Sequence, residues 1–192
     1  MALMATALIL LLPHSGRAAD LNLGKAKAAQ CEGCHGKNGV STDPTIPSLA
    51  GQHKIYTSRE LRAFKTTTRV NATMNQIAGG LTEREISALA SYYQTLKPMT
   101  NHGGSSSAVQ DGDGFSLSQG KVSYAFCQGC HGPRGSGNEA NPRIAGQHAA
   151  YLIQQLEAYK EGARKSPIMS GIASALTDDE IQNLAEYMAG LK

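Results

Sequence analysis

Two copies of the pentapeptide Cys-x-x-Cys-His stand in the chain, at residues 31–35 and 127–131, and together they use all four cysteines. This pattern is the attachment signature of c-type haem. Two thiols at this spacing can each add to one haem vinyl group, and the histidine that follows, His35 or His131, is placed to bind the iron. The sequence therefore predicts two covalently bound haem c groups, held by Cys31 and Cys34 and by Cys127 and Cys130.

Paired cysteines also serve other chemistries. A Cys-x-x-Cys pair is equally a redox dithiol or half of a zinc site, and four cysteines in an exported protein can form two disulfides. The histidine at the same position in both copies, together with the match between the residues that follow them, favours haem over these alternatives.

The first residues have the pattern of an export signal. Residues 2–12 are an uncharged apolar run, and the small pair Ala18-Ala19 precedes Asp20, as in a secretory signal peptide. We expect residues 1–19 to be removed and the mature protein to be periplasmic. The apolar run is shorter than the roughly 20 residues that a membrane-spanning helix needs, and no other segment approaches that length, so the mature chain is expected to be soluble.

The charge of the chain argues against one class of partner. The formal net charge is +3, which is too small to indicate binding to nucleic acid. The halves differ, since residues 20–100 hold 10 basic and 6 acidic residues whereas residues 101–192 hold 7 and 9. A dipolar molecule of this kind favours docking by one end, although ordinary solvated surface gives the same counts.

The two halves are copies of one unit. Gly24-Lys25 recurs as Gly120-Lys121, and the heptapeptide PSLAGQH at residues 47–53 recurs as PRIAGQH at residues 142–148. Two copies of this length can each enclose a core, so the sequence predicts a duplicated domain and not a solenoid. The expected order is domain 1 at residues 20–97, a Gly/Ser-rich linker at 98–114, and domain 2 at 115–192.

Helices joined by long loops are predicted in each unit, and no segment alternates as a strand. Thr82-x-x-Glu85 and Thr177-x-x-Glu180 are capping boxes, which predict the start of the last helix in each unit. Two earlier helices are expected in each unit, at residues 23–34 and 54–65 and at residues 117–130 and 149–162. The predicted fold class is all-α.

The second axial ligand decides what each haem can do. An open sixth position binds oxygen or peroxide and allows an enzyme, whereas a closed position leaves electron transfer alone. Met74 and Met169 are the candidate ligands, because they stand at equivalent positions of the repeat, in predicted loops before the final helices. A thioether ligand raises the reduction potential, which suits the high-potential end of a respiratory chain.

Two alternatives to methionine ligation remain. Each methionine could instead fill a core, which is the commoner role of this residue. His53 and His148 are rival ligands, since they are the only other histidines at repeated positions, and ligation by two histidines would lower the potential. Each stands at the predicted start of a helix, where an exposed histidine or one facing a haem propionate is the plainer account.

These residues together resemble the dihaem cytochrome c4 family, a tandem of two class I cytochrome c domains. The resemblance rests on the two Cys-x-x-Cys-His-Gly motifs, Gly24 and Gly120, the repeated Ala-Gly-Gln segments, Ser166-Pro167-Ile168-Met169 and the closing Leu-Thr helices. It implies that the carbonyl of Pro47 or Pro142 accepts the Nδ1 proton of the haem histidine. It also implies propionate contacts for Tyr56, Tyr151, Arg69 and Arg164.

The resemblance implies a periplasmic electron carrier, loosely associated with the membrane, without a small-molecule substrate or catalysis of its own. It would take electrons from a quinol-oxidising cytochrome bc complex and pass them to a terminal oxidase. A dihaem cytochrome subunit of an enzyme complex such as flavocytochrome c sulfide dehydrogenase is the alternative, because that subunit resembles the same tandem. A dihaem peroxidase would need one open or bis-His haem, and the matched methionines show no such asymmetry.

Two features depart from the family pattern. Ala72 stands where domain 2 has Pro167, so the first methionine segment is expected to be less rigid. The Gly/Ser-rich linker leaves open whether the two domains pack against each other.

Overall fold

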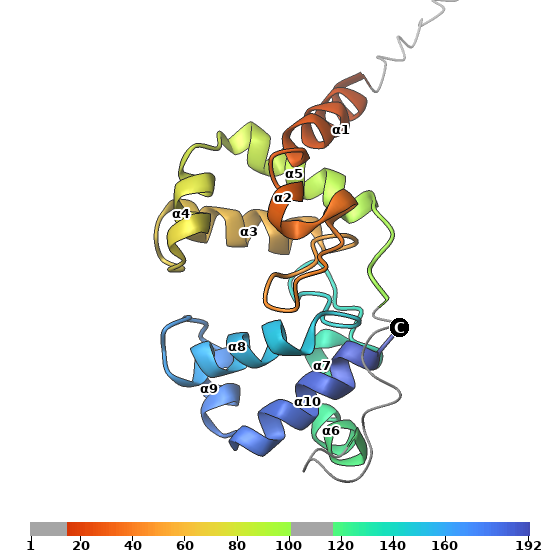
Figure 1. Cartoon of the computed structure of the whole chain (residues 1–192), viewed down its shortest axis with the longest axis vertical. Helices are drawn as coiled ribbons and strands as arrows, with labels where there is room; N and C mark the ends of the chain where they lie inside the picture. The colour runs from red at the N-terminus through yellow and green to blue at the C-terminus, as the bar shows by residue number, and fades with distance from the viewer. Residues whose placement is uncertain (1–14, 101–116) are drawn as a thin grey trace, which may run out of the picture.

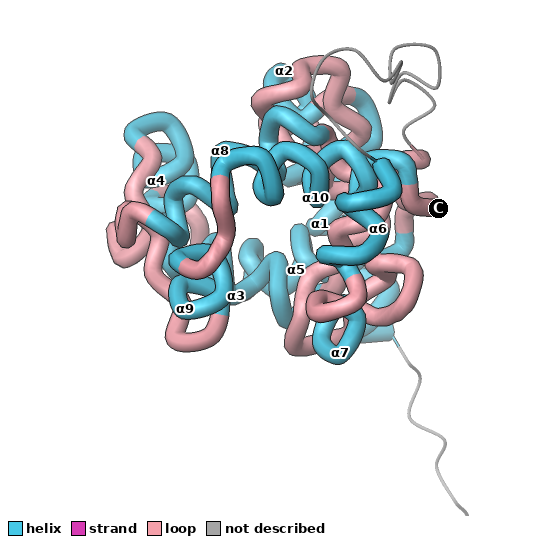
Figure 2. The backbone as a smooth tube through the Cα atoms, turned by 90° about the horizontal axis from the view of Figure 1, so that it is seen from below, coloured by secondary structure: helices cyan, strands magenta, loops and turns pink. Residues whose placement is uncertain are grey.

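The computed structural model describes residues 15–100 and 117–192, which form two helical domains stacked along the long axis of the molecule (Figure 1). Within these two ranges the chain contains helices and loops and no strand, as the tube in Figure 2 shows. The all-α prediction is therefore confirmed. Most of the predicted signal peptide, residues 1–19, and most of the predicted linker, residues 98–114, lie outside the described residues.

Both domains repeat one order of helices. Domain 1 contains α1 (Ser15–Ala28), α2 (Glu32–His35), the 3₁₀ turn η1 (Lys37–Gly39), α3 (Lys54–Lys65), α4 (Ala72–Gly79) and α5 (Glu83–Thr95). Domain 2 contains α6 (Leu117–Tyr124), α7 (Gln128–His131), α8 (Ala149–Lys160), α9 (Met169–Ser174) and α10 (Asp178–Gly190). The duplicated sequence thus gives a duplicated fold, in which α3 and α8 face each other across the boundary (Figure 1).

Some predicted boundaries were wrong. The long helices predicted at residues 23–34 and 117–130 are each interrupted by a turn, in which the amide nitrogens of Cys31 and Cys127 donate to the carbonyls of Ala28 and Tyr124 at 2.9 Å. The haem motif therefore forms a separate short helix. The methionine segments, predicted as loops, form the helices α4 and α9, while α3 spans residues 54–65 as predicted.

In both domains the first and last helices cross in close contact at a glycine. A Cβ added to Gly24 in α1 would lie 2.2 Å from the carbonyl oxygen of Ala88 in α5. A Cβ added to Gly120 in α6 would lie 2.2 Å from the carbonyl oxygen of Asn183 in α10. Only glycine permits so close an approach of two backbones, and the approach brings each haem motif, which follows the first helix, against the last helix.

The two cores differ by an exchange of aromatic side chains. Domain 2 has the buried Tyr124 on its first helix where domain 1 has Ala28, and domain 1 has the buried Tyr93 on its last helix where domain 2 has Met188. Each core therefore contains one tyrosine in the cluster that packs against its first haem cysteine. A large residue on one helix compensates for a smaller one on the other, which keeps the core filled.

The last helix of each domain begins at a capping box, as predicted. The Glu85 amide nitrogen donates to Thr82 Oγ1 at 3.2 Å, and the Thr82 amide nitrogen donates to Glu85 Oε2 at 2.8 Å. Thr177 and Glu180 repeat the pair at 3.3 Å and 2.8 Å. These reciprocal bonds satisfy backbone donors at the start of α5 and α10.

Candidate haem sites

The Cys-x-x-Cys-His motif folds into one helical turn in each domain. The His35 amide nitrogen donates to the Cys31 carbonyl at 2.9 Å, and the His131 amide nitrogen donates to the Cys127 carbonyl at the same distance. Cys31 and Cys127 are half-buried against their cores, whereas the second cysteine of each motif is exposed, and all four thiols are free. Two thiols and one imidazole therefore stand together on a single short element in each domain.

A glycine ends each motif helix because no other residue fits the backbone there. Gly36 and Gly132 have φ values of 76° and 78°, in the left-handed region that glycine adopts without strain. A Cβ on Gly36 would also lie 1.9 Å from the carbonyl oxygen of Val40. The sixth residue of each Cys-x-x-Cys-His-Gly motif is thus required by the turn that follows the histidine.

The two motif histidines are buried and oriented by a proline carbonyl. His35 and His131 are each 8% exposed. Nδ1 of His35 donates to the Pro47 carbonyl at 2.8 Å, and Nδ1 of His131 donates to the Pro142 carbonyl at 3.0 Å. These bonds confirm the contact that the resemblance implied, and they leave Nε2 as the ring nitrogen for a metal. In residues 15–100 and 117–192 nothing hydrogen-bonds to Nε2 of either ring.

Burial sets the protonation of these side chains. It lowers the pKa of His35 and of His131, and the hydrogen bond to the proline carbonyl offsets this only in part. A neutral imidazole has the lone pair that a metal needs. Burial raises the pKa of Cys31 and of Cys127, which favours the thiol over the thiolate form.

The candidate methionine ligands lie near the start of short helices, and in each case a side-chain oxygen three residues earlier accepts from the methionine amide nitrogen. The Met74 amide nitrogen donates to Asn71 Oδ1 at 2.9 Å, and the Met169 amide nitrogen donates to Ser166 Oγ at 3.2 Å. Both methionine side chains are half-buried. The signal for these helices was present in the sequence, since Asn and Ser are favoured N-cap residues and each stands three positions before its methionine.

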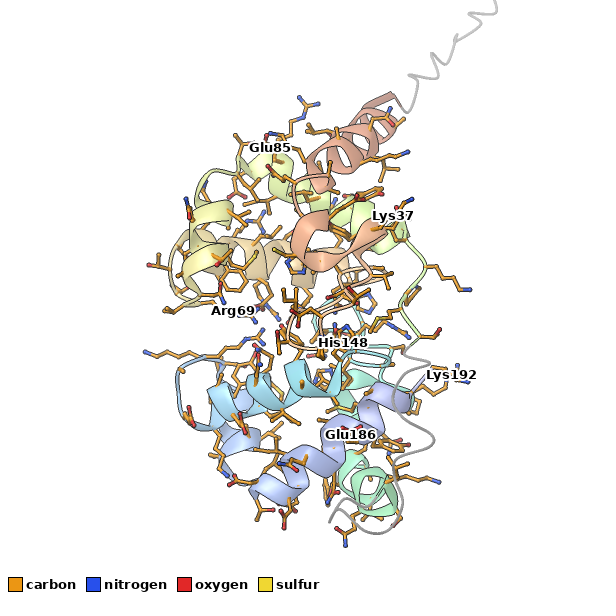
Figure 3. All side chains as sticks on the ribbon, in the orientation of Figure 1. Lys37, Arg69, Glu85, His148, Glu186 and Lys192 are labelled. Carbon is orange, nitrogen blue, oxygen red and sulfur yellow. The ribbon has the colours of Figure 1, made fainter. Side chains whose placement is uncertain are left out.

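The rival ligands His53 and His148 lie at the domain boundary. Nε2 of His53 donates to the Ser136 carbonyl at 2.8 Å, and Nε2 of His148 donates to the Ser41 carbonyl at 3.0 Å. Each histidine therefore binds the backbone of the other domain, and Figure 3 shows His148 between the two domains. Of the two expected environments, exposed or facing a haem propionate, the exposed one was wrong for His148, which is 9% exposed, because domain 1 covers it.

Two glutamines that the sequence did not mark as functional join the domains. Gln52 Oε1 accepts from the Arg143 amide nitrogen and Gln52 Nε2 donates to the Arg143 carbonyl, both at 2.9 Å. Gln147 forms the same two bonds with Ser48, both at 3.0 Å. The domains thus pack against each other closely, which the composition of the linker had left open.

The four residues for which the resemblance implied propionate contacts form one cluster between the domains. Arg69 Nη2 donates to the Tyr151 hydroxyl at 3.1 Å, and Arg164 Nη2 donates to the Tyr56 hydroxyl at 3.0 Å. Each arginine therefore reaches the tyrosine of the other domain. Their contact with propionates stays a prediction, which the strong attraction of guanidinium for carboxylate supports.

The donors in each domain fit haem c. Each site combines two free thiols, one of them half-buried, with a buried imidazole whose Nε2 has no hydrogen-bond partner in the described residues. This set provides both thioether links and one axial nitrogen. The fold and the two sites therefore define a c-type cytochrome with one site in each domain.

Comparison with known proteins identifies the family. The cytochrome c family profile matches residues 22–97 and again residues 117–192. Cytochrome c4 of Azotobacter vinelandii is 34% identical over 91% of this chain and 90% of its own length. The thiosulfate dehydrogenase electron acceptor of Thiomonas intermedia is 33% identical over 85% of this chain and 79% of its own. The crystal structure of reduced recombinant cytochrome c4 from Pseudomonas stutzeri matches with a TM-score of 0.79 at 28% identity, over 90% of this chain and 98% of that one.

The chain belongs to the cytochrome c family and, within it, to the dihaem cytochromes c4. It is an electron-transfer protein with two covalently bound haem c groups, one at each Cys-x-x-Cys-His motif. This decides between haem and the zinc, dithiol and disulfide alternatives.

Proposed function

We propose that this protein is a periplasmic carrier that moves electrons from a quinol-oxidising cytochrome bc complex to a terminal oxidase or another acceptor. Bound haem supplies reversible one-electron chemistry, and the protein supplies ligands, orientation and electrostatics. The observation that carries the proposal is the equivalence of the two sites. Each domain offers a buried histidine oriented by a proline carbonyl and a methionine near the start of a short helix. A carrier without substrate chemistry needs no difference between the two sites.

In this proposal His35 and Met74 bind one iron, and His131 and Met169 bind the other. Ligation by both methionines would close the sixth position and exclude oxygen and peroxide. Their equivalent places near the starts of α4 and α9, where a side-chain oxygen three residues earlier accepts from each methionine amide nitrogen, support this assignment. The positions of His53 and His148 support it as well, since Nε2 of each is bound to a carbonyl of the other domain.

The packing of the domains supports a carrier that holds two electrons. Equivalent glutamine and histidine contacts on both sides of the boundary hold the domains in one arrangement. A fixed arrangement keeps the two haem sites at a constant separation. Electrons can then be exchanged between the sites without a domain movement.

We also infer a periplasmic location with loose attachment to the membrane surface. The apolar run at residues 2–12 supports export, because it has the length of the hydrophobic region of a signal peptide. In the two ranges that the structure describes, no helix combines the length and the apolar character needed to cross a bilayer.

A second candidate is the cytochrome partner or subunit of a sulfur-oxidising dehydrogenase, of which flavocytochrome c sulfide dehydrogenase is one form. The similarity to the thiosulfate dehydrogenase electron acceptor, at 33% identity over 85% of this chain, favours this candidate. Both candidates use the same haem chemistry and differ in the donor.

The donor and the acceptor are tested with protein purified from the periplasm. Quinol-dependent reduction by membranes that contain a bc complex, followed by oxygen-dependent reoxidation by oxidase-containing membranes, is the expected result. Inhibition of the bc complex should abolish the reduction. A flavoprotein that co-purifies at a fixed ratio, with no exchange with bc-containing membranes, would instead establish the second candidate.

A further inference from the structure

At the domain boundary α3 carries Glu60 where α8 carries Gln155, so the two domains differ in charge at this equivalent position. Glu60 Oε2 accepts from Arg69 Nη1 at 2.7 Å and from Arg164 Nη2 at 2.8 Å. Gln155 Oε1 accepts from Arg69 Nη2 at 2.7 Å and from Arg164 Nη1 at 2.9 Å. Glu60, Arg69, Gln155 and Arg164 thus form a closed interdomain ring, and Figure 3 shows Arg69 at the boundary.

The interdomain ring is shielded from water and carries a net charge. The side chains of Glu60, Arg69 and Arg164 are only 15%, 13% and 8% exposed. Burial alone would raise the pKa of Glu60, but the guanidinium groups of Arg164 and then of Arg69 hold that pKa below its usual range. One ionised carboxylate therefore faces two buried arginines, while Arg59, 3.5 Å from Glu60 Oε1, is exposed. Salt screens such buried charges much less than surface charges.

The two arginines of the ring stand on the segments that lead into the methionine helices, Arg69 before α4 and Arg164 before α9. The Arg69 guanidinium stacks 4.5 Å from the centre of the Phe64 ring, before α4, and the Arg164 guanidinium stacks 4.6 Å from the centre of the Tyr159 ring, before α9. The amide nitrogens of the two arginines donate to the carbonyls of Ala63 and Ala158 at 3.0 Å and 2.8 Å. Glu60 therefore joins equivalent segments of the two domains through a single oxygen.

We propose that Glu60 is a positioning residue that sets the charge between the two haem sites and so lowers the reduction potentials of both haems. Reduction adds one negative charge to a haem site. A fixed carboxylate opposes that change, whereas an arginine without a counter-charge favours it. Gln155 fills the equivalent place without a charge, so the ring contains one carboxylate and not two.

The proposal goes beyond the proposed function, since it requires the two haems but no particular donor or acceptor. It also explains why an acidic residue stands in a boundary whose glutamine and histidine contacts are equivalent in the two domains. A purely structural ring could use glutamine at both positions, because the glutamine already present binds the same two arginines.

The test uses three variants of the haem-loaded protein: Glu60→Gln, Gln155→Glu and the double exchange of both. We expect Glu60→Gln to raise the reduction equilibrium constants of both haems on the order of threefold, which is about 28 mV at 59 mV per tenfold change. Gln155→Glu should lower both constants by a similar factor. The double exchange restores the charge and keeps both arginines paired, so its potentials should return towards those of the wild type.

Redox titration with spectroscopic assignment of both irons measures these shifts. The charge predicts potential shifts of opposite sign in the two single variants, which a change of packing alone does not predict. Shifts of the same sign in both, or no shift in either, would overturn the proposal. Gln155→Glu adds a charge without removing a contact, and it decides the question if Glu60→Gln does not fold. The shifts in potential do not depend on the electron donor. A protein that fails to exchange electrons with the bc complex would still show them, so either proposal can fail without the other.

Discussion

Gln147 and Ser48 bind each other twice across the domain boundary: the Ser48 amide nitrogen donates to Gln147 Oε1, and Gln147 Nε2 donates to the Ser48 carbonyl, both at 3.0 Å. Ser48 directly follows Pro47, whose carbonyl orients His35. A single short segment therefore positions the haem histidine of domain 1 and holds domain 2. The same relation recurs in domain 2, where Pro142 orients His131 and Arg143 binds Gln52.

We expect Gln147→Ala to weaken the contact between the domains. The substitution leaves the amide and the carbonyl of Ser48 without partners at a buried site, and each unsatisfied group costs about 1–3 kcal/mol. Urea unfolding followed by haem absorbance should show a free energy of unfolding lower by about 2–6 kcal/mol in total for the two groups. Gln154→Ala, at an exposed position of α8, is the control, and equal unfolding of the two variants would contradict the prediction.

The sequence predicted the parts of the fold that each domain forms from its own residues. The helix at residues 54–65 and both capping boxes are where the periodicity and the Thr-x-x-Glu pattern placed them. The same holds for the proline carbonyls on the haem histidines, which the resemblance implied.

The sequence did not predict how the two domains meet. Gln147 and His148 of domain 2 are polar residues that a single domain would leave at its surface, and they are buried where they contact domain 1. Hydrophobic periodicity reports which residues face the core of one domain, so it carries no signal for polar contacts between domains. The helices that carry Met74 and Met169 were missed for another reason, because a helix of six or eight residues is too short to show a periodic pattern.

The glycine at each helix crossing gives a second prediction. Gly120→Ala places a Cβ 2.2 Å from the Asn183 carbonyl oxygen, so α6 and α10 must move apart. Overpacking of this kind typically costs about 1–3 kcal/mol, and thermal unfolding of domain 2 should show that loss. Gly171→Ala is the matched control in the same domain, because nothing lies within 4 Å of the added Cβ. A Gly120→Ala variant as stable as the control would disprove the close crossing.

The proposed methionine ligation gives a third prediction. In the native ferric protein both haems should show the near-infrared sulfur-to-iron charge-transfer band, and the reduced protein should not bind carbon monoxide. Met169→Ala should remove about half of the band and allow the binding of about one carbon monoxide per molecule. Met188→Leu, a change in the domain 2 core, should leave both properties intact. Stoichiometric carbon monoxide binding by the native protein would reject closed coordination.

The iron bond should also support the fold of domain 2. His131→Ala removes an iron ligand and leaves the Pro142 carbonyl without its partner. Since aromatic residues are only 5% of the chain and the haem supplies apolar bulk to a small core, we expect domain 2 of this variant to be poorly folded. Circular dichroism during heating measures this, with Lys121→Ala as an exposed control. Melting of His131→Ala like that of the control would contradict a structural role for the ligand.

Glu85 should make the stability of domain 1 sensitive to acid. Its hydrogen bond with Lys27, together with those from Thr82, lowers the pKa of Glu85 from 4.5 to about 2. Because the folded state binds this proton more weakly than the unfolded state, the stabilisation is complete above a pH of about 4.5 and is lost as the pH falls to about 2. Glu85→Gln removes this contribution, so the variant should be less stable than the wild type at pH 7, and the difference should shrink between pH 4.5 and 2. Urea unfolding across that range measures the difference. A constant gap between Glu85→Gln and the wild type at every pH would show that the carboxylate of Glu85 does not stabilise the start of α5, because a group without a lowered pKa in the folded state cannot change the slope.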